Sequence, residues 1–383
     1  MRIEITDLDG LREHRAAGHD LRGAVLTGLD LTGAEDDRLL RTALDGAVLL
    51  GCVLRPATTR RAEAAGALLF PTIPDVPYQV YRTSLYTPAE LFEGFDPDRP
   101  ESYVDTLDAR IYRHTRAHGR HPSALHALAA RLHDHAITEA LDALLALRGG
   151  RPIAVMGGHA LTRDSAAYRA AVDLGVEIGR SEIEPGGPGF TVLTGGGPGA
   201  MEAVPLGVRL AGASRSTVDE AVRTLSVAPR FGASPAGIGA WLAAALRMDL
   251  PAGTTTATIG IPTWFYGHEP PNAACALHAK YFANSAREDG LVTVASGGVI
   301  YTPGSAGTVQ EVFQDYTQNH YDTPAPMVFL GKEFWTSEVP AAPLVQQLAR
   351  GRAAERWVLV TDEPAEAVAL LAAYAVDQAD RDS

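Results

Sequence analysis

The chain has 383 residues, of which 46% are hydrophobic and 21% charged, as expected for a globular protein that buries a core in two or three domains. Its formal net charge of −13 argues against a nucleic-acid partner, because affinity for a phosphate backbone comes from an excess of Lys and Arg. The two cysteines, Cys52 and Cys275, are too few for a disulfide framework.

The N-terminal sequence MRIEITDLDGLREHR lacks the apolar stretch of a signal peptide. The chain also has no run of 18 apolar residues that could cross a bilayer. We therefore expect a cytoplasmic protein with no membrane partner.

Residues 1–70 are predicted to form a small N-terminal region. Within it, residues 21–54 repeat Leu, Gly and Ala in a loose five-residue rhythm. Such a rhythm is typical of a small stacked solenoid, but an irregular hairpin region would fit this short stretch equally well. Neither alternative implies catalysis.

Residues 71–150 are predicted to form a linker and a helical segment. Six prolines between positions 71 and 100 indicate a loop. Leucines then recur near helical spacing through residues 101–147, and Gly149 and Gly150 end the segment.

Residues 151–376 alternate apolar runs with Ala-rich helical stretches, which predicts a Rossmann-like doubly wound α/β domain with a parallel sheet covered on both faces. The carboxyl ends of its strands, where ligands bind in such folds, would share one edge. The predicted strands are 153–156, 190–193, 257–261, 299–301, 327–330 and 357–360. The predicted helices are 163–180, 237–248, 273–287, 308–320 and 364–376.

The first glycine-rich loop follows the predicted strand 190–193 and opens a helix. Glycines allow the backbone to approach a ligand closely, and free N–H groups at a helix start attract an anion. We expect this loop to contact a phosphate, although a tight turn without a ligand is the alternative. The predicted phosphate-binding residues are Gly195, Gly196, Gly197 and Gly199.

The second loop follows the predicted strand 299–301 and opens the helix 308–320. Thr308 and Glu311 fit a capping box, which would account for both residues without a function. The preceding Pro-Gly-Ser-Ala-Gly is not explained in this way, and its backbone and hydroxyl groups could hold a phosphate. The predicted phosphate-binding residues here are Gly304, Ser305, Ala306, Gly307 and Thr308.

No cofactor is expected. Neither loop is a Walker P-loop or a GxGxxG dinucleotide fingerprint. A pyridoxal phosphate enzyme would need a Schiff-base lysine, and the only lysines, Lys280 and Lys332, lie outside both loops. No metal site is expected either: His114, His118 and His121 have helical spacing but stand among arginines that repel a cation, which favours a solvated face.

The two loops, in this order and each between a strand and a helix, resemble the GGGxxG and PGGxGTxxE motifs of the LOG (LONELY GUY) family. The resemblance covers residues 151–376. It implies a nucleoside 5'-monophosphate phosphoribohydrolase that releases free base and ribose 5-phosphate, and a homo-oligomer (dimer or higher). Ser305 stands where the family usually has glycine.

The family also has an Arg-Lys pair on the helix before the second loop. Arg287 is the best match to that arginine, and Glu288 replaces the lysine. The resemblance implies that Arg287 binds the phosphate or stabilises the departing base. A surface ion pair with Glu288 or Asp289 is the alternative.

Glu311 is the predicted catalytic carboxylate. It would lie one turn into a helix whose start holds the 5'-phosphate, so the phosphate would position the sugar beside it. A carboxylate there can stabilise an oxocarbenium-like transition state or activate water. The alternative function is a non-catalytic nucleotide or pterin carrier or sensor, which would need the loops but neither Glu311 nor Arg287.

Overall fold

The computed structural model describes residues 3–119, 122–149, 151–183, 189–248, 257–265 and 269–382. The chain divides into two compact units. The first comprises Met1–Ser84 and His118–Ala140, and the second comprises Leu85–Ala117 and Leu141–Ser383. In the described residues, no helix combines the length and the apolar character needed to cross a membrane.

The first unit contains a four-stranded parallel sheet whose strands follow in sequence order. Strand β2 pairs in parallel with β3, which lies 23 positions further along the chain, so that Val25 is beside Val48 and Leu26 is beside Leu49. A helix between each strand and the next makes this a stacked β/α arrangement rather than a hairpin, which would require antiparallel strands. The elements are β1 (Glu4–Ile5), α1 (Leu8–Ala16), β2 (Val25–Thr27), α2 (Ala34–Leu39), β3 (Val48–Leu50), α3 (Pro56–Ala64) and β4 (Leu68–Phe70).

Leucines fill the interior of this stack, and Leu11, Leu21, Leu26 and Leu31 are fully buried. The rhythm in the sequence therefore comes from leucines that recur at each turn of the stack. Gly28 and Gly51 turn the chain after β2 and β3 with φ of 69° and 62°, a conformation that glycine adopts without strain.

A helical segment precedes the sheet of the second unit. Its elements are α4 (Pro88–Leu91), η1 (Pro100–Asp105) and α5 (Leu107–His118), and α6 (Ala124–Arg148) follows. Asp108 of α5 is fully buried and accepts hydrogen bonds from Lys280 Nζ at 2.6 Å and Trp264 Nε1 at 2.8 Å. This network fixes α5 to the segments that follow β7 and β8.

The second unit is built on a seven-stranded, all-parallel sheet with the order β11-β10-β9-β5-β6-β7-β8. All six predicted strands are confirmed, and the short edge strand β8 adds a seventh. Because the chain winds outward from β5 in one direction and from β9 in the other, the fold is Rossmann-like and doubly wound, as predicted. The strands are β5 (Arg151–Met156), β6 (Phe190–Thr194), β7 (Ala257–Gly260), β8 (Leu277–His278), β9 (Val299–Tyr301), β10 (Met327–Leu330) and β11 (Val358–Thr361).

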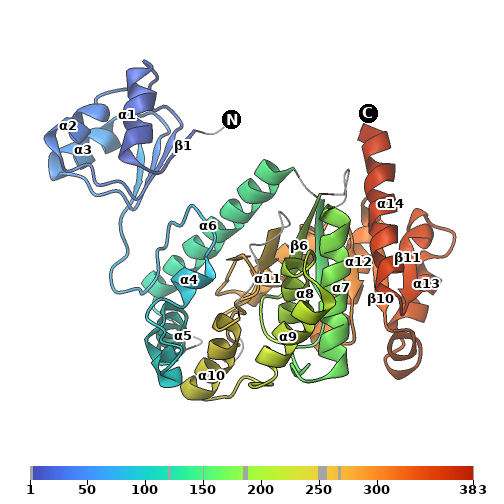
Figure 1. Cartoon of the computed structure of the whole chain (residues 1–383). Coiled ribbons are helices and arrows are strands. Elements are labelled where there is room, and N and C mark those ends of the chain that lie inside the picture. Colours follow the sequence, from blue (N-terminus) through green and yellow to red (C-terminus); the bar gives the residue numbers. More distant parts are fainter. Residues whose placement is uncertain are drawn as a thin grey trace. The chain divides into compact units, whose positions relative to one another are not determined.

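Helices cover the sheet, with α7 packed against α8 and α14, and α12 packed against α11 and α13 (Figure 1). Their bounds are α7 (Ala166–Ile183), α8 (Ala200–Arg209), α9 (Arg215–Leu225), α10 (Pro235–Leu246), α11 (Asn284–Thr293), α12 (Ala306–Tyr321), α13 (Ala341–Ala349) and α14 (Pro364–Asp382). Two short helices, η2 (Phe334–Glu338) and η3 (Ala353–Trp357), flank α13.

The predicted helix 273–287 is wrong. Asn272 starts a turn there, because its Oδ1 accepts hydrogen bonds from the backbone N–H groups of Ala274 and Cys275. The chain then forms the edge strand β8, and α11 begins only at Asn284. Pairing with β7 overrides the helical preference of the alanines in this segment.

Candidate functional site

The two sequence motifs meet at the point where the strand order reverses, between β5 and β9. Gly158, just after β5, donates its N–H to Pro303 O at 3.2 Å, and its carbonyl accepts from Ala200 N at 3.2 Å. These two hydrogen bonds join the segment after β5 to the second loop and to the start of α8, where the first loop ends. In doubly wound sheets, the crevice at this position is where ligands bind.

The first glycine loop, residues 195–199, is buried along its whole length. Gly196 and Gly199 have φ of 73° and 72°. A Cβ on Gly196 would lie 2.9 Å from Gly260 Cα, and one on Gly199 would collide with Gly158 O. Both glycines are thus required by backbone packing, which accounts for them without a ligand.

Asn272 forms hydrogen bonds to the same loop with its side chain and its backbone. Its Nδ2 donates to the carbonyls of Gly197 and Met201, both at 3.0 Å, and its backbone N–H donates to Gly196 O at 2.8 Å. The side chain of Asn272 is fully buried. The loop is therefore a rigid platform held by Asn272, a residue that the sequence analysis did not single out.

The second loop differs, because Ser305, Ala306 and Gly307 are exposed. Helix α12 begins at Ala306, and its N-cap residue Ser305 makes no side-chain capping bond. The first N–H groups of a helix have no partner within it, so those of α12 are donors at an exposed helix start. An anion could bind there.

The capping box, the alternative explanation for Thr308 and Glu311, does not form. Helix α12 starts two residues before Thr308, which places that side chain inside the first turn instead of at the N-cap. Thr308 is buried, and its hydroxyl lies over Gly304, where a Cβ would collide with it. Glycine at position 304 therefore leaves the space that Thr308 fills.

Arg287 and Glu311 lie together, although they come from different helices. Arg287 Nη1 is 3.3 Å from Glu311 Oε1, and the exposed fractions of the two side chains are 17% and 10%. Arg287 Nε also donates to Ile261 O at 3.1 Å, beyond β7. The side chains of Glu288 and Asp289, the alternative partners considered for Arg287, lie outside the described residues.

Arg287 also reaches the first glycine loop. A Cβ built on Gly195 would lie 2.6 Å from Arg287 Nη2, so glycine is what allows the guanidinium to approach the backbone there. Arg287 therefore touches the loop after β6 and pairs with a carboxylate on the helix after β9. The structure brings together a cation, a carboxylate and both motif loops.

One turn beyond Glu311, Asp315 is a buried carboxyl that the sequence analysis missed. Tyr301 Oη donates to Asp315 Oδ2 at 2.6 Å, and Asn319 Nδ2 donates to Oδ1 at 3.1 Å. Burial raises the pKa of Asp315 to about 7, although both hydrogen bonds lower it. An acidic residue four positions after Glu311 was the only signal in the sequence.

Beside the first loop, Arg163 and Glu202 form a buried ion pair. Arg163 Nε and Nη2 donate to the two carboxylate oxygens of Glu202 at 2.8 and 2.5 Å. Tyr168 Oη donates to the same carboxylate at 2.9 Å, and Arg163 Nη1 donates to Trp241 O at 2.8 Å. The bidentate pair fixes α8, and hence the end of the first loop, to the segment after β5.

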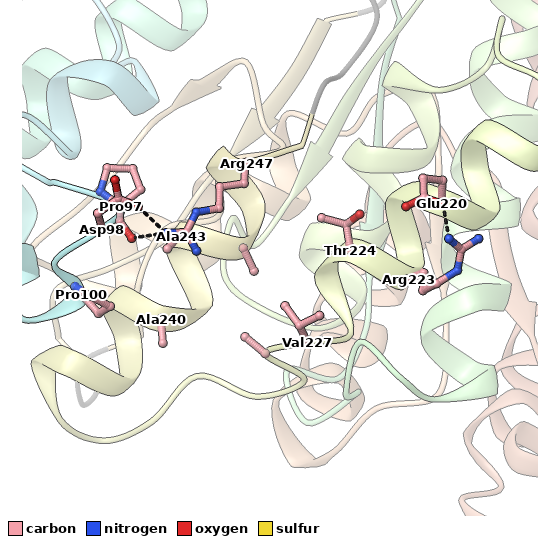
Figure 2. A pocket seen from close by; sticks show the side chains of 12 residues that line it. Pro97, Asp98, Pro100, Glu220, Arg223, Thr224, Val227, Ala240, Ala243 and Arg247 are labelled. Atoms are coloured by element: carbon pink, nitrogen blue, oxygen red, sulfur yellow. Dashed lines mark hydrogen bonds and ion pairs between the residues drawn. The ribbon is translucent and has the colours of Figure 1, made fainter.

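A pocket of about 540 Å³ lies away from both loops, between α9, α10 and the segment before η1 (Figure 2). Ala240 and Ala243 of α10 line it, and ion pairs Arg247–Asp98 and Arg223–Glu220 stand at its rim. Its volume exceeds that of the pocket beside the first loop, but it contains no residue from either motif.

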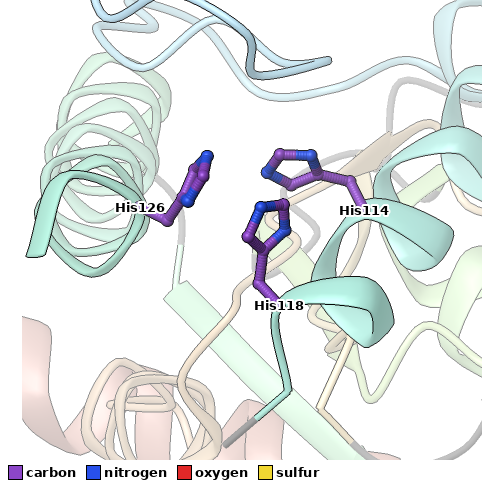
Figure 3. Close-up of side chains that lie close together, drawn as sticks. All are labelled: His114, His118 and His126. Atoms are coloured by element: carbon purple, nitrogen blue, oxygen red, sulfur yellow. The ribbon is translucent and has the colours of Figure 1, made fainter. Parts of the chain in front are cut away.

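Two of the histidines set aside in the sequence, His114 and His118, are half-buried instead of lying on a solvated face. His114 and His118 lie one turn apart on α5, and the ring centroids of His118 and His126 are 3.8 Å apart (Figure 3). His114 belongs to the second unit, whereas His118 and His126 belong to the first. His121 lies outside the described residues.

In comparisons with known proteins, no family model matches the chain, and no curated protein matches it significantly. The function is therefore argued from the residues of the site.

Proposed function

We propose that this protein hydrolyses the N-glycosidic bond of nucleoside 5'-monophosphates, giving free base and ribose 5-phosphate. The observation that carries the proposal is the Arg287–Glu311 pair. Arg287 adjoins the first glycine loop at Gly195, and Glu311 stands on α12, whose exposed start is part of the second loop. The resemblance of both loops to the LOG family motifs supports the same reaction. A mere phosphate carrier would need no carboxylate at this position.

The 5'-phosphate would bind the free N–H groups at the start of α12, with Ser305 Oγ beside them. Glu311 follows Ala306 by five helical positions, a rise of about 7.5 Å along the axis. That separation suits the span of a ribose phosphate. The anchored phosphate would therefore hold C1' near the carboxylate.

In the reaction, water attacks C1' while the bond from C1' to the base nitrogen breaks. Glu311 stabilises the positive charge that develops on the sugar and accepts one proton of the water, whose oxygen bonds to C1'. The leaving base nitrogen takes up a proton from solvent, and Glu311 returns its proton to solvent after the reaction. Arg287, released from Glu311 by the incoming anion, would contact the phosphate or the leaving base. No metal or cofactor is needed for this balance of atoms.

The test is incubation with a panel of nucleoside monophosphates and measurement of released base. Wild type should release base, and Glu311→Gln, which keeps the size of the side chain but removes the charge, should lower kcat by about 100-fold or more. Glu333→Ala removes an exposed carboxylate outside the site and should leave kcat unchanged. Nucleotide binding without base release by wild type would favour the carrier or sensor of the same fold.

The same proposal includes a cytoplasmic enzyme that assembles as a homo-oligomer, as the family resemblance implies. Light scattering of the purified full chain measures the assembly directly. A monomer at micromolar concentration would contradict that part of the proposal and leave the assay of base release unaffected.

A further inference from the structure

A second pocket, of about 320 Å³, opens beside the first glycine loop. Pro198 and Gly199 form its edge on the loop side, and the segment after α9 supplies Pro229, Arg230 and Phe231. All of its lining residues lie in the second unit. The volume is that of a small-molecule site.

The walls of this pocket are mostly apolar and aromatic. Phe231 is half-buried, and its ring centroid lies 6.4 Å from that of the buried Trp241 in an edge-on arrangement. Arg163 covers the ring of Trp241, with Cζ 4.3 Å from its centroid. Because Arg163 is already bonded to Glu202 and to two carbonyls, it stiffens the wall and is not available to a ligand.

Two polar side chains complete the lining. His159 and Arg230 are both exposed, and neither has an ion-pair partner among the residues that the structure describes. An aromatic wall with a cation beside it suits a flat ring that carries carbonyl or imine acceptors. An aliphatic ligand would make no use of this combination.

The pocket adjoins the junction of the motif loops. A Cβ on Gly199 would lie 3.0 Å from His159 Cα, and Gly158, which precedes His159, is bonded to both Pro303 and Ala200. A ligand with its phosphate at the start of α12 could therefore extend across Gly158 into this pocket.

We propose that this pocket binds the base of the nucleotide, with Phe231 as the stacking face and Arg230 as a hydrogen-bond donor to the ring. The inference rests on the proposed function for the identity of the ligand. It goes further by assigning base recognition to the segment after α9, which neither motif contains.

The experiment measures binding of the two products, which are not turned over, by calorimetry on the full chain. Adenine and guanine probe the pocket, and ribose 5-phosphate probes the helix start. Phe231→Leu, which keeps an apolar side chain but removes the ring, should weaken base binding and raise the KM for the matching nucleotide by about tenfold. Its affinity for ribose 5-phosphate should stay as in wild type.

Phe231→Tyr keeps an aromatic ring and should bind the base with the affinity of wild type. Phe265→Leu removes an exposed ring outside the pocket and is the matched control. Equal base affinity in wild type and Phe231→Leu would overturn the inference. If Phe231→Leu loses affinity for the base and for ribose 5-phosphate equally, Phe231→Tyr decides. The inference is overturned if Phe231→Tyr also loses affinity for the base. Ring-dependent base binding without nucleotide hydrolysis would uphold the pocket and overturn the proposed activity.

Discussion

Asp315 shows how a buried position changes the chemistry of a single carboxyl group. Its neighbours on α12 and β9 supply two hydrogen bonds, but the loss of water outweighs them and raises its pKa to about 7. Glu311, one turn earlier, is paired with Arg287 instead. Two acidic residues on one helix face thus have different environments because only one has a cation beside it.

Asp315 should make stability depend on pH. Its folded pKa lies above its unfolded value of 3.8, so the folded state favours the protonated form and the contribution is complete below pH 4. As pH rises from 4 to 7, wild type should lose up to about 4 kcal/mol of unfolding free energy relative to Asp315→Asn, which cannot ionise. Urea unfolding at several pH values measures the difference.

The control for this prediction is Asp164→Asn, which changes an exposed carboxyl in the same unit. Its unfolding free energy should follow that of wild type across the range. A difference between wild type and Asp315→Asn that does not vary between pH 4 and 7 would contradict the buried, raised-pKa carboxyl.

At the scale of elements, the first glycine loop and helix α8 depend on a side chain from the segment before β8. Asn272 uses both ends of its amide, donating to two carbonyls of the loop region and accepting from two N–H groups of its own turn. Removing a buried amide leaves such groups without a partner, at a cost of about 1–3 kcal/mol for each unsatisfied group.

Asn272→Ala should therefore lower the free energy of unfolding by about 4 kcal/mol or more, the lower limit for four such groups. Because the loop also meets Arg287 at Gly195, the proposed nucleosidase activity should fall as well. Denaturant unfolding and the base-release assay measure the two effects, with the exposed Gln347→Ala as the control. A fully stable Asn272→Ala would show that the loop keeps its shape without the amide.

Several elements were predictable because their pattern is local. The strands from β5 to β11 are short apolar runs bounded by glycine or polar residues, and all except the two-residue β8 were found. Strand β8 and the turn at Asn272 were missed because they depend on pairing with β7 and on a side-chain bond. From its alanine content alone, that segment would be predicted to be helical.

The candidate site was predictable only in part, for the same reason. Both motif loops and their two side chains could be named from sequence, but the contact between Arg287 and Gly195 spans 92 positions and appears only in the fold. The capping box failed because α12 starts earlier than Thr308. The pocket lined by Phe231 and Arg230 draws on four separate segments, which no local pattern connects.

At the scale of the whole molecule, the second unit is assembled from two distant stretches of chain. Asp108 joins the stretch 85–117 to the sheet part, because its carboxylate accepts hydrogen bonds from Lys280 and Trp264. Tyr103, from the same stretch as Asp108, donates to the same carboxylate. Burial lowers the pKa of Lys280, and the charge of Asp108 opposes that effect. Both charges are fully buried, so each ionised group relies on the other for the stabilisation that water would otherwise provide.

This dependence can be measured with a double-mutant cycle. Lys280→Met should lower the free energy of unfolding by about 3–5 kcal/mol, because it leaves the Asp108 carboxylate buried without its cation. Asp108→Asn should have a similar effect through the unpaired ammonium. The double variant removes both charges and should lose much less than the sum of the two single changes. Additive losses in denaturant unfolding would mean that the hydrogen bond from Trp264, and not the ion pair, attaches Asp108 to the sheet part of the unit.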